Sequence, residues 1–583
     1  MSSTDVHSRL AGHIWSVADK LRGEYKRHEY GSVILPFTLL RRLDLVMAPV
    51  RGQVRAKDRE LTQKGANDGA RAAQLVVAAG MPFYNTSKQD FSSVGAVGSD
   101  AAMNLKDYVR KFSANAREIF DQFEFEDQID RLAEHDLLYQ VVQRYQDRDL
   151  DLHPARVSNE DMGYVFEHLI RLFSEASNET AGEHFTPREV IKLMVNLLIG
   201  PDGDTIGENG KVVKLYDPAC GTGGILTAAD EHIRSLNPGN IKVFLYGQEL
   251  NPESWAVCQA DMLMRRQKSE IVRGNSFSAD GFGGERFQTF DYLMANPPFG
   301  VEWKKVEKVV RAEADEPNGR FSAGLPRIND GSLLFLQHMI SKMTPMQPSR
   351  GMLGARLAIV FNGSPLFSGG AGSGESDIRR WILEQDLLEG IVALPDQLFF
   401  NTGISTYFWI LSNCKPKELR DKVILLDARE YWEKMRKSLG QKRKQIGETQ
   451  IAEITRLYGQ ALDAAADPEH PGHDRVKVLA TEDFGYRRIT VERPLKLRFT
   501  VTEEGLELLA EAKAFDKLAE SRDGLIEALR PLLGQEWWTL KEARAALHEA
   551  AATTGAPWPK SAAPAEGDLG GVLRTGPERR RSD

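Results

Sequence analysis

The sequence predicts an α/β chain built around a doubly wound, mostly parallel sheet. Between residues 155 and 415, short apolar segments alternate with helical patterns, as they do in βαβ units. A glycine-rich turn joins one of these apolar segments to a helix. On both sides of this region, apolar residues recur every three or four positions, which is typical of helices.

Composition excludes several classes of protein. The chain has 583 residues, 42% hydrophobic and 27% charged, as in an ordinary globular protein of several domains. It has no run of about 18 apolar residues and no apolar amino-terminal signal, so we expect a cytoplasmic protein. Its cysteines, Cys220, Cys258 and Cys414, lie far apart without CxxC spacing, so we expect neither disulfides nor a metal site.

The formal net charge of -8 is unlike that of a chain that binds nucleic acid by itself. Such proteins gain much of their affinity from lysine and arginine at phosphates. If the substrate is DNA, a partner is therefore expected to help hold it.

The flanking regions are expected to be helical. Residues 1–150 show helical spacing at 14–23 and 33–43, with a polar loop near 84–101, and form the predicted amino-terminal helical domain. Residues 416–555 form a helical region for partner or DNA contact, with helices at 430–465, 510–533 and 540–551. The run at 433–444 is basic; a solvated helix face is the default interpretation of such a run, and a DNA or partner contact is the less favoured one. Residues 556–583 are expected to be disordered.

The central domain, residues 151–415, contains six candidate strands, at residues 212–216, 243–247, 292–295, 357–361, 388–393 and 407–411. The first ends at Asp217, and Gly221, Gly223 and Gly224 follow at once. Glycines let the backbone turn tightly and approach a ligand closely, although many such turns serve only to pack a helix on a sheet. The turn lacks the sequence of a phosphate-binding loop.

Two further positions carry candidate binding groups. Glu249 ends the second candidate strand, where an acidic side chain can accept hydrogen bonds from ribose hydroxyls; an exposed acid is the structural alternative. Thr186, Pro187 and Glu189 fit the N-cap, N1 and N3 positions of a capping box. The amide groups of that helix start suit a carboxylate, but from this stretch alone a well-capped helix is the favoured explanation.

The third candidate strand runs directly into Asn296-Pro297-Pro298-Phe299. The prolines make the turn rigid, while the Asn296 amide and a backbone carbonyl remain as hydrogen-bond acceptors. Two adjacent acceptors suit an NH2 group on an aromatic ring, whose lone pair they would free by favouring a pyramidal nitrogen. Phe299 offers a face for stacking a base. A stiff strand-to-loop corner would account for the motif equally well.

Taken together, Asp217-Pro-Ala-Cys-Gly-Thr-Gly-Gly and Asn296-Pro-Pro-Phe resemble the motifs of amino-methyltransferases that use S-adenosylmethionine. The order of the motifs, with Phe-Thr-Pro first, resembles N6-adenine DNA methyltransferases of the gamma arrangement. The chain is similar in particular to the modification (M) subunit of type I restriction-modification systems. Segments at 15–23, 35–43, 438–443 and 484–495 extend the resemblance over most of residues 10–500. It implies a Rossmann-like methyltransferase sheet.

The resemblance also implies a role for each motif. The methionine end of the cofactor would lie against Glu183, His184, Phe185, Thr186, Pro187 and Arg188. The turn containing Asp217, Gly221, Thr222, Gly223 and Gly224 would lie under the cofactor, and Glu249 would take the ribose hydroxyls. Asn275 stands where many relatives have aspartate near the adenine ring of the cofactor, and its amide can accept from the ring amino group. Asn296 and the Pro297 carbonyl, beside Pro298, would hold the target N6 amine, with Phe299 stacked on the flipped adenine.

The implied reaction is an in-line displacement by adenine N6 on the sulfonium methyl group, which requires positioning and no metal. The chain shows no target-recognition module and no P-loop, so the resemblance implies a specificity subunit that selects the DNA site and a separate restriction subunit. Two M chains would join one specificity subunit. Methylation of a protein glutamine amide and a non-catalytic scaffold that retains the fold are the alternatives.

Overall fold

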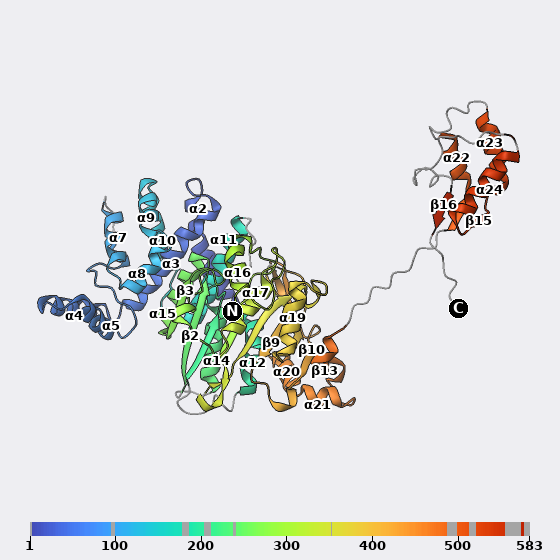
Figure 1. Ribbon diagram of the computed structural model, residues 1–583. Helices are drawn as coiled ribbons and strands as arrows, with labels where there is room; N and C mark the ends of the chain where they lie inside the picture. The colour runs from blue at the N-terminus through green and yellow to red at the C-terminus, as the bar shows by residue number, and fades with distance from the viewer. Residues whose placement is uncertain are drawn as a thin grey trace. The chain divides into compact units, whose positions relative to one another are not determined.

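The computed structural model describes residues 3–94, 100–147, 149–177, 186–202, 212–236, 241–350, 352–400, 402–486, 498–511, 521–553, 555 and 573–576. The chain forms two compact units, residues 1–486 and 487–583 (Figure 1). Within the described ranges, no helix combines the length and the apolar character needed to span a bilayer.

The amino-terminal part of the first unit is helical, as expected. Helix α3 lies at its centre, with 14 of its 18 residues buried, because apolar side chains surround nearly its whole circumference. A short helix, α6, lies within the stretch expected to be a loop. The helices are α1 (Ser3–Trp15), α2 (Val17–Leu21), α3 (Tyr30–Met47), α4 (Arg51–Gln63), α5 (Asp68–Ala79), α6 (Phe91–Val94), α7 (Ala101–Arg110), α8 (Ala114–Asp121), α9 (Phe125–Glu134), α10 (Leu138–Gln146) and α11 (Asn159–Ser177).

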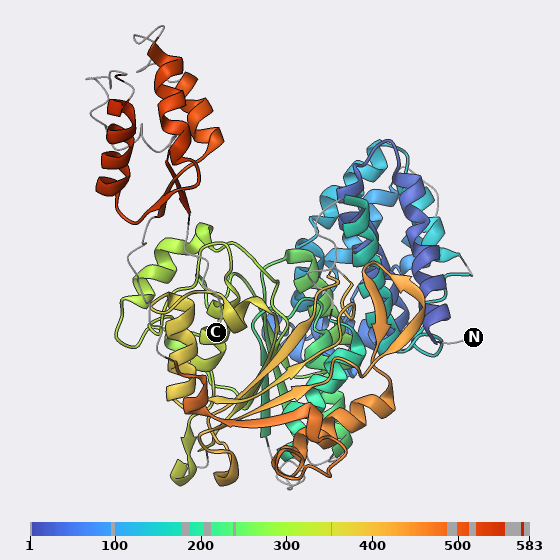
Figure 2. The same cartoon turned by 90° about the vertical axis from the view of Figure 1, so that its right-hand side faces the viewer.

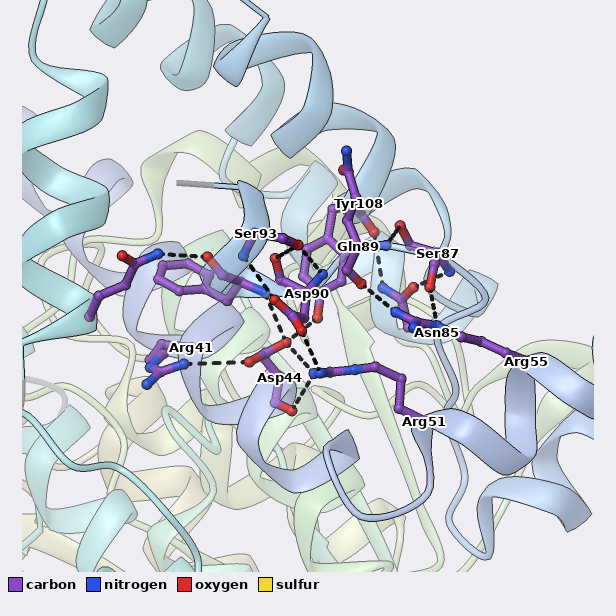
Figure 3. A network of polar contacts seen from close by, with 12 residues as sticks. Arg41, Asp44, Arg51, Arg55, Asn85, Ser87, Gln89, Asp90, Ser93 and Tyr108 are labelled. Carbon is purple, nitrogen blue, oxygen red and sulfur yellow. Dashed lines mark hydrogen bonds and ion pairs between the residues drawn. The ribbon is translucent and has the colours of Figure 1, made fainter. Parts of the chain in front are cut away.

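A buried carboxylate, Asp44 near the end of α3, joins several of these helices (Figure 3). Its Oδ1 accepts hydrogen bonds from Arg51 of α4 at 2.5 Å, from the Tyr108 hydroxyl of α7 at 2.6 Å, and from the backbone N–H of Phe91 at 3.1 Å. Its Oδ2 lies 3.4 Å from Arg41. The charge is thus compensated by two arginines, and its removal would leave their guanidinium groups without this partner.

Nine strands form the main sheet, in the order β13-β10-β8-β9-β7-β4-β1-β2-β3. The six expected strands are confirmed to within two residues, and β3, β10 and β13 were not predicted. Strand β9 is antiparallel to β7 and β8, and β13 is antiparallel to β10; the other pairs are parallel. The strands are β1 (Val212–Asp217), β2 (Lys242–Glu249), β3 (Ser269–Arg273), β4 (Tyr292–Ala295), β7 (Arg356–Asn362), β8 (Leu388–Ala393), β9 (Thr406–Ser412), β10 (Lys422–Asp427) and β13 (Val476–Ala480).

Helices cover both faces of the sheet (Figure 2). Alternate residues of β4 and β7 enter two separate apolar clusters, one packed against α12, α14, α15 and α20 and the other against α17 and α19. The doubly wound α/β fold is therefore confirmed. These helices are α12 (Arg188–Ile199), α14 (Gly224–Leu236), α15 (Pro252–Arg265), α16 (Glu307–Ala314), α17 (Ser332–Ser341), α18 (Ser364–Phe367), α19 (Gly374–Glu384), α20 (Glu448–Gly459) and α21 (Ala461–Ala466).

Strand order reverses at β1, because β2 pairs with one of its edges and β4 with the other. The connections that follow β1 and β4 therefore leave the sheet in opposite directions and open a crevice between them. Ligands of open α/β sheets bind in a crevice of this kind, at the carboxyl ends of the strands.

The helix expected over residues 430–447 is wrong. Strands β11 (Glu433–Leu439) and β12 (Lys442–Gln445) form an antiparallel hairpin, and α20 begins only at Glu448. Gly440 turns the chain with a φ of +60°. The backbone N–H groups of Gln441 and Arg443 donate to the carbonyls of Phe400 and Gln397, so contacts distant in the sequence override the local helical pattern.

The second unit combines helices with a small sheet. It contains α22 (Glu503–Glu511), α23 (Ser521–Leu529) and α24 (Leu540–Thr553), which confirms helices in the two expected stretches. The sheet of β15 (Glu536–Trp537), β14 (Arg498–Val501) and β16 (Leu573–Gly576) was not expected, and β16 lies within the tail expected to be disordered. In the first unit, β5 (Met346–Gln347) and β6 (Met352–Leu353) form a short hairpin.

The Asp44 network predicts a large effect on stability. We expect Asp44→Ala to lower the free energy of unfolding by about 2 to 4 kcal/mol, because it leaves the buried Tyr108 hydroxyl and the Phe91 N–H without their acceptor and removes one of the two carboxylates that pair with Arg51. The matched control is Asp19→Ala, which breaks an exposed pair with Arg22 and should cost about 0.5 kcal/mol or less. Urea unfolding followed by circular dichroism measures both, and equal losses would contradict a special role for Asp44.

Candidate functional site

A cavity of about 670 Å³ lies at the carboxyl ends of β1, β2 and β4, where the strand order reverses. Apolar surface predominates in its lining, with a few polar groups from separate connections, as in small-molecule sites. The structure brings nine of the predicted site residues to this cavity: Thr186, Asp217, Gly221, Thr222, Gly224, Glu249, Asn275, Asn296 and Pro298.

The glycines of the turn after β1 have different roles. Gly221 has a φ of +54° and lines the cavity. Gly223 has a φ of +84°, and a Cβ there would lie 2.8 Å from the Cys258 sulfur of α15. This glycine allows close packing of the turn on a helix, so the structural explanation applies to Gly223, while Gly221 and Gly224 leave room at the cavity wall.

Asp217, at the end of β1, is fully buried beside the cavity. Its Oδ1 accepts a hydrogen bond from the Ala219 N–H at 3.0 Å, but its Oδ2 is buried and has no protein partner within the described residues. Burial raises the pKa of this carboxyl to about 8; the Ala219 hydrogen bond opposes the shift, and the Glu249 carboxylate adds to it. The site thus holds an unsatisfied acidic group.

Glu249, at the end of β2, is buried, which excludes the alternative of an exposed acid. Its Oε2 accepts from the Gly221 N–H at 2.8 Å and its Oε1 from the Asn251 N–H at 2.7 Å. These bonds fix the carboxylate at the cavity wall. Each oxygen retains a second lone pair with which to accept a hydroxyl group.

Asn296 follows β4 and contacts the segment before α12. Its Nδ2 donates to the Thr186 hydroxyl at 2.9 Å, while its Oδ1 is buried with no protein partner within the described residues. The predicted capping box is therefore wrong: α12 begins at Arg188, with Pro187 as its N-cap and no side-chain cap. Thr186 instead holds the asparagine, and Glu189 forms an ion pair with Lys442 of β12.

The other residues of the Asn-Pro-Pro-Phe motif lie around this amide. Pro298 lines the cavity, whereas Pro297 is buried and does not line it. Phe299 is half-buried, with its ring centre 6.3 Å from that of Phe399 in an edge-to-face contact. Neither Pro297 nor Phe299 is part of the cavity wall.

Two predicted residues make contacts that change their interpretation. Arg188 binds Glu167 of α11 at 2.9 Å and lies over the Tyr164 ring, so Glu167, and not the arginine, lines the cavity. Burial raises the pKa of Glu167, and Arg188 opposes the shift.

The Oδ1 of Asn275 accepts hydrogen bonds from the N–H groups of residues 277 and 278 at 2.9 and 3.3 Å. Its remaining polar atom is Nδ2, a donor. Glu183, His184 and Phe185 lie outside the described residues.

One wall of the cavity was missed by the sequence analysis. The segment after the Asn-Pro-Pro-Phe motif supplies five lining residues, including the buried Trp303, whose Nε1 donates to the Arg327 carbonyl at 2.9 Å. No local sequence motif predicts that these residues line a cavity; the presence of a large apolar side chain, Trp303, is the one feature that could have indicated a buried segment here. The five are Val301, Glu302, Trp303, Lys305 and Val306.

Arg320, also unpredicted, lies between α16 and α17 and links two sides of the cavity. Its guanidinium group donates to the carbonyls of Ser276 and Phe277 and to His338 Nδ1, each at 2.8 Å. Burial, together with Arg320, lowers the pKa of His338 to about 3, so the imidazole is neutral. With Nδ1 accepting, the proton lies on Nε2, 2.8 Å from the Tyr216 hydroxyl next to Asp217. Arg320 and His338 thereby link the loop after β3, which contains Ser276 and Phe277, to the end of β1 at Tyr216.

Comparison with known proteins extends these observations. A family model described as N-6 DNA Methylase matches residues 157–478, and one described as HsdM N-terminal domain matches residues 10–144. The type I restriction enzyme MjaIX methylase subunit of Methanocaldococcus jannaschii is 24% identical over 444 residues, 72% of each chain. The HindI methylase subunit of Haemophilus influenzae is 32% identical over 282 residues, 48% of this chain and 56% of that protein.

A solved structure confirms the fold. The type I restriction-modification methyltransferase subunit from Streptococcus thermophilus superposes with a TM-score of 0.60 at 20% identity, covering 82% of this chain and 96% of that one. The similarity thus includes the helical amino-terminal part as well as the sheet. The resemblance inferred from the motifs is confirmed.

Asp217 makes the stability of the ligand-free chain depend on pH. With a folded-state pKa near 8 against an ordinary value of 3.8, its carboxyl is protonated when folded and ionised when unfolded at neutral pH. Its stabilising contribution is complete below pH 3.8 and is lost as the pH rises through about 8. Urea unfolding at about pH 6 to 8 should therefore show a steeper fall in stability than in Asp217→Asn, by up to about 1.4 kcal/mol per pH unit. Parallel slopes would show that this carboxyl is already ionised.

Proposed function

Since this chain belongs to the N-6 DNA methylase family, we propose that Asn296 holds the N6 amine of an adenine in DNA while it accepts a methyl group from S-adenosylmethionine. The observation that carries the proposal is the buried Oδ1 of Asn296, which has no protein partner within the described residues although its Nδ2 is held by Thr186. A buried acceptor without a donor is costly, and an amine N–H of the substrate would satisfy it.

The residues at the cavity fit S-adenosylmethionine. The fixed carboxylate of Glu249 suits the two ribose hydroxyls, and the turn at Gly221 and Gly224 leaves room beside the backbone. Burial keeps the Asp217 carboxyl neutral in the ligand-free chain, and a positively charged ligand beside its unsatisfied Oδ2 would favour loss of that proton and pair with the resulting carboxylate. Asn275 would donate through Nδ2 to a ring nitrogen, which replaces the acceptor role first expected for it. When bound, the cofactor supplies a methyl group on a positively charged sulfur.

Catalysis at Asn296 would consist of positioning and polarisation. The Thr186 hydroxyl fixes the amide so that Oδ1 accepts one N–H of the adenine amine, and the Pro297 carbonyl would accept the other. Two acceptors draw the nitrogen toward a pyramidal geometry, which makes its lone pair available. With the cofactor bound, N6 would gain the methyl group as the carbon–sulfur bond breaks, the electron pair of that bond would stay on sulfur, and the methylated amine would give one proton to water.

The target base would have to leave the DNA duplex to reach this position. Pro298 at the cavity wall and the half-buried ring of Phe299 offer apolar surface beside Asn296, against which an extruded adenine can stack. An edge-to-face contact with Phe399 helps to hold the Phe299 ring in place.

The chain would act as the modification subunit of a type I restriction-modification complex. A specificity subunit would select the DNA site, two copies of this chain would join it, and a restriction subunit would cut. The net charge of -8 fits a division in which DNA affinity is shared with a partner. The proposal includes a helical amino-terminal domain, residues 1–150, a methyltransferase domain from residue 151, and a cytoplasmic location, where DNA and cofactor are both present.

Asn296→Ala tests the proposed reaction. The full chain, purified with its co-encoded specificity subunit, receives radiolabelled cofactor and unmethylated DNA, and the DNA is digested and analysed for N6-methyladenine. We expect the variant to lose roughly a hundredfold or more in kcat, because the acceptor of the amine is gone, while cofactor affinity by calorimetry is unchanged. The matched control, Asn67→Ala, removes the N-cap of α5 and should leave the rate unaltered.

Two results would overturn the proposal. Label in protein, and not in N6-methyladenine, would indicate methylation of a glutamine amide. Absence of any transfer by the natural chain with its specificity subunit would indicate a scaffold without activity.

Thr186 should affect the rate through the orientation of Asn296. Thr186→Val keeps the shape but removes the hydroxyl, and we expect about a tenfold fall in kcat, the value of one net hydrogen bond. Thr186→Ser keeps the hydroxyl and should retain most of the activity. Initial rates at saturating DNA and cofactor measure the difference; equal rates for Val and Ser would show that the bond does not position the amide.

A further inference from the structure

The β11–β12 hairpin, residues 433–445, is a basic segment in an acidic chain. Six of its 13 residues are lysine or arginine and one is acidic, whereas the whole chain has a net charge of -8. Lys434, Arg436 and Arg443 are exposed, and none of them forms an ion pair within the parts of the chain that the structure describes. Three cations are therefore available to a partner.

Buried contacts hold this hairpin in place. The Lys442 ammonium group, almost fully buried, forms an ion pair with Glu189 of α12 and donates to the Leu398 carbonyl at 3.0 Å. The N–H of Arg443 donates to the Gln397 carbonyl at 3.0 Å. In Figure 2, the orange strands of the hairpin stand apart from the central sheet. The exposed cations thus project from a fixed ribbon.

The hairpin contacts two segments that in turn contact the Asn296 side of the cavity. The loop that receives its hydrogen bonds contains Phe399, whose ring packs against Phe299. Glu189, the partner of Lys442, stands three residues after Thr186, which binds Asn296. Both attachments of the hairpin therefore join it to elements that hold the proposed target adenine.

We propose that the β11–β12 hairpin binds the phosphate backbone of the target strand beside the base presented to Asn296. The inference rests on the proposed function, since it needs DNA at this side of the cavity. Phosphate contacts set the position of a protein on DNA without reading sequence, which is the task left to a subunit whose partner selects the site. Extrusion of a base costs unstacking energy, and contacts to the phosphate backbone can supply binding energy that offsets this cost.

The test removes the three exposed charges in the full chain purified with its specificity subunit, as Lys434→Gln, Arg436→Gln and Arg443→Gln together. Binding of a short fluorescein-labelled duplex is measured by anisotropy over a range of salt concentrations. We expect the slope of log K against log salt to fall by up to about three, one for each lost contact, and the KM for DNA to rise about tenfold or more. The kcat at saturating DNA and the cofactor affinity should not change.

A matched triple variant removes equal charge elsewhere: Lys242→Gln, Lys417→Gln and Lys422→Gln. These exposed lysines lie at or near the amino ends of strands, away from the cavity, and should leave the salt slope unaltered. A charge-retaining hairpin variant, with Lys434→Arg, Arg436→Lys and Arg443→Lys, should keep the KM for DNA near that of the natural chain. Circular dichroism confirms folding of each variant.

Specific outcomes would overturn the inference. Equal weakening of DNA binding by both charge-removing triples would show a general effect of charge. Unchanged DNA binding would contradict a phosphate contact, and weakened binding that excess specificity subunit restores would assign the hairpin to a protein interface. The proposed function is tested separately, because Asn296→Ala should bind the duplex normally and fail only in methyl transfer.

Discussion

The reversal of strand order at β1 is the constraint on which the cavity depends. Because β2 and β4 pair with opposite edges of β1, the turns after β1 and β4 diverge and leave a crevice between Asp217 and Asn296. Strand β4 is buried at all four positions, with alternate residues in two apolar clusters. A shift of one residue would move each side chain into the other cluster, so the register that places Asn296 is fixed by packing.

Two polar groups at this crevice remain unsatisfied in the ligand-free chain. The Oδ2 of Asp217 and the Oδ1 of Asn296 are buried without protein partners within the described residues, at a cost of roughly 1 to 3 kcal/mol each. Such a cost persists in a folded protein when the surrounding structure imposes it. Here the doubly buried sheet and the hydrogen bond that Asn296 donates to Thr186 impose it. The Asn296 oxygen stays available to an amine, and the Asp217 carboxyl can pair with a cation once it loses its proton.

The net charge of the whole chain and the charge of the β11–β12 hairpin have opposite signs. The hairpin with Lys434, Arg436 and Arg443 is positive and fixed, while the whole chain is negative. Local cations beside a crevice can hold a phosphate backbone without giving the whole chain high affinity for any DNA. An acidic chain with a local basic ribbon therefore suits an enzyme that depends on a partner to choose its site.

The sequence alone determined the elements whose signals are local and strong. The six strands, the glycine turn, Glu249 and the rigid corner at Asn296 follow from apolar patterning and from the backbone limits of glycine and proline, which act within a few residues. Tertiary structure decided the partners. The sequence around Thr186 predicts a helix cap, but in the structure its hydroxyl binds Asn296, 110 residues away. Residues 433–445 satisfy a helical pattern but form a hairpin, because their backbone bonds to residues 397 and 400. The fold alone places Trp303 in the cavity wall and joins Arg320 to the Ser276 carbonyl, 44 residues away, because no local pattern specifies either contact.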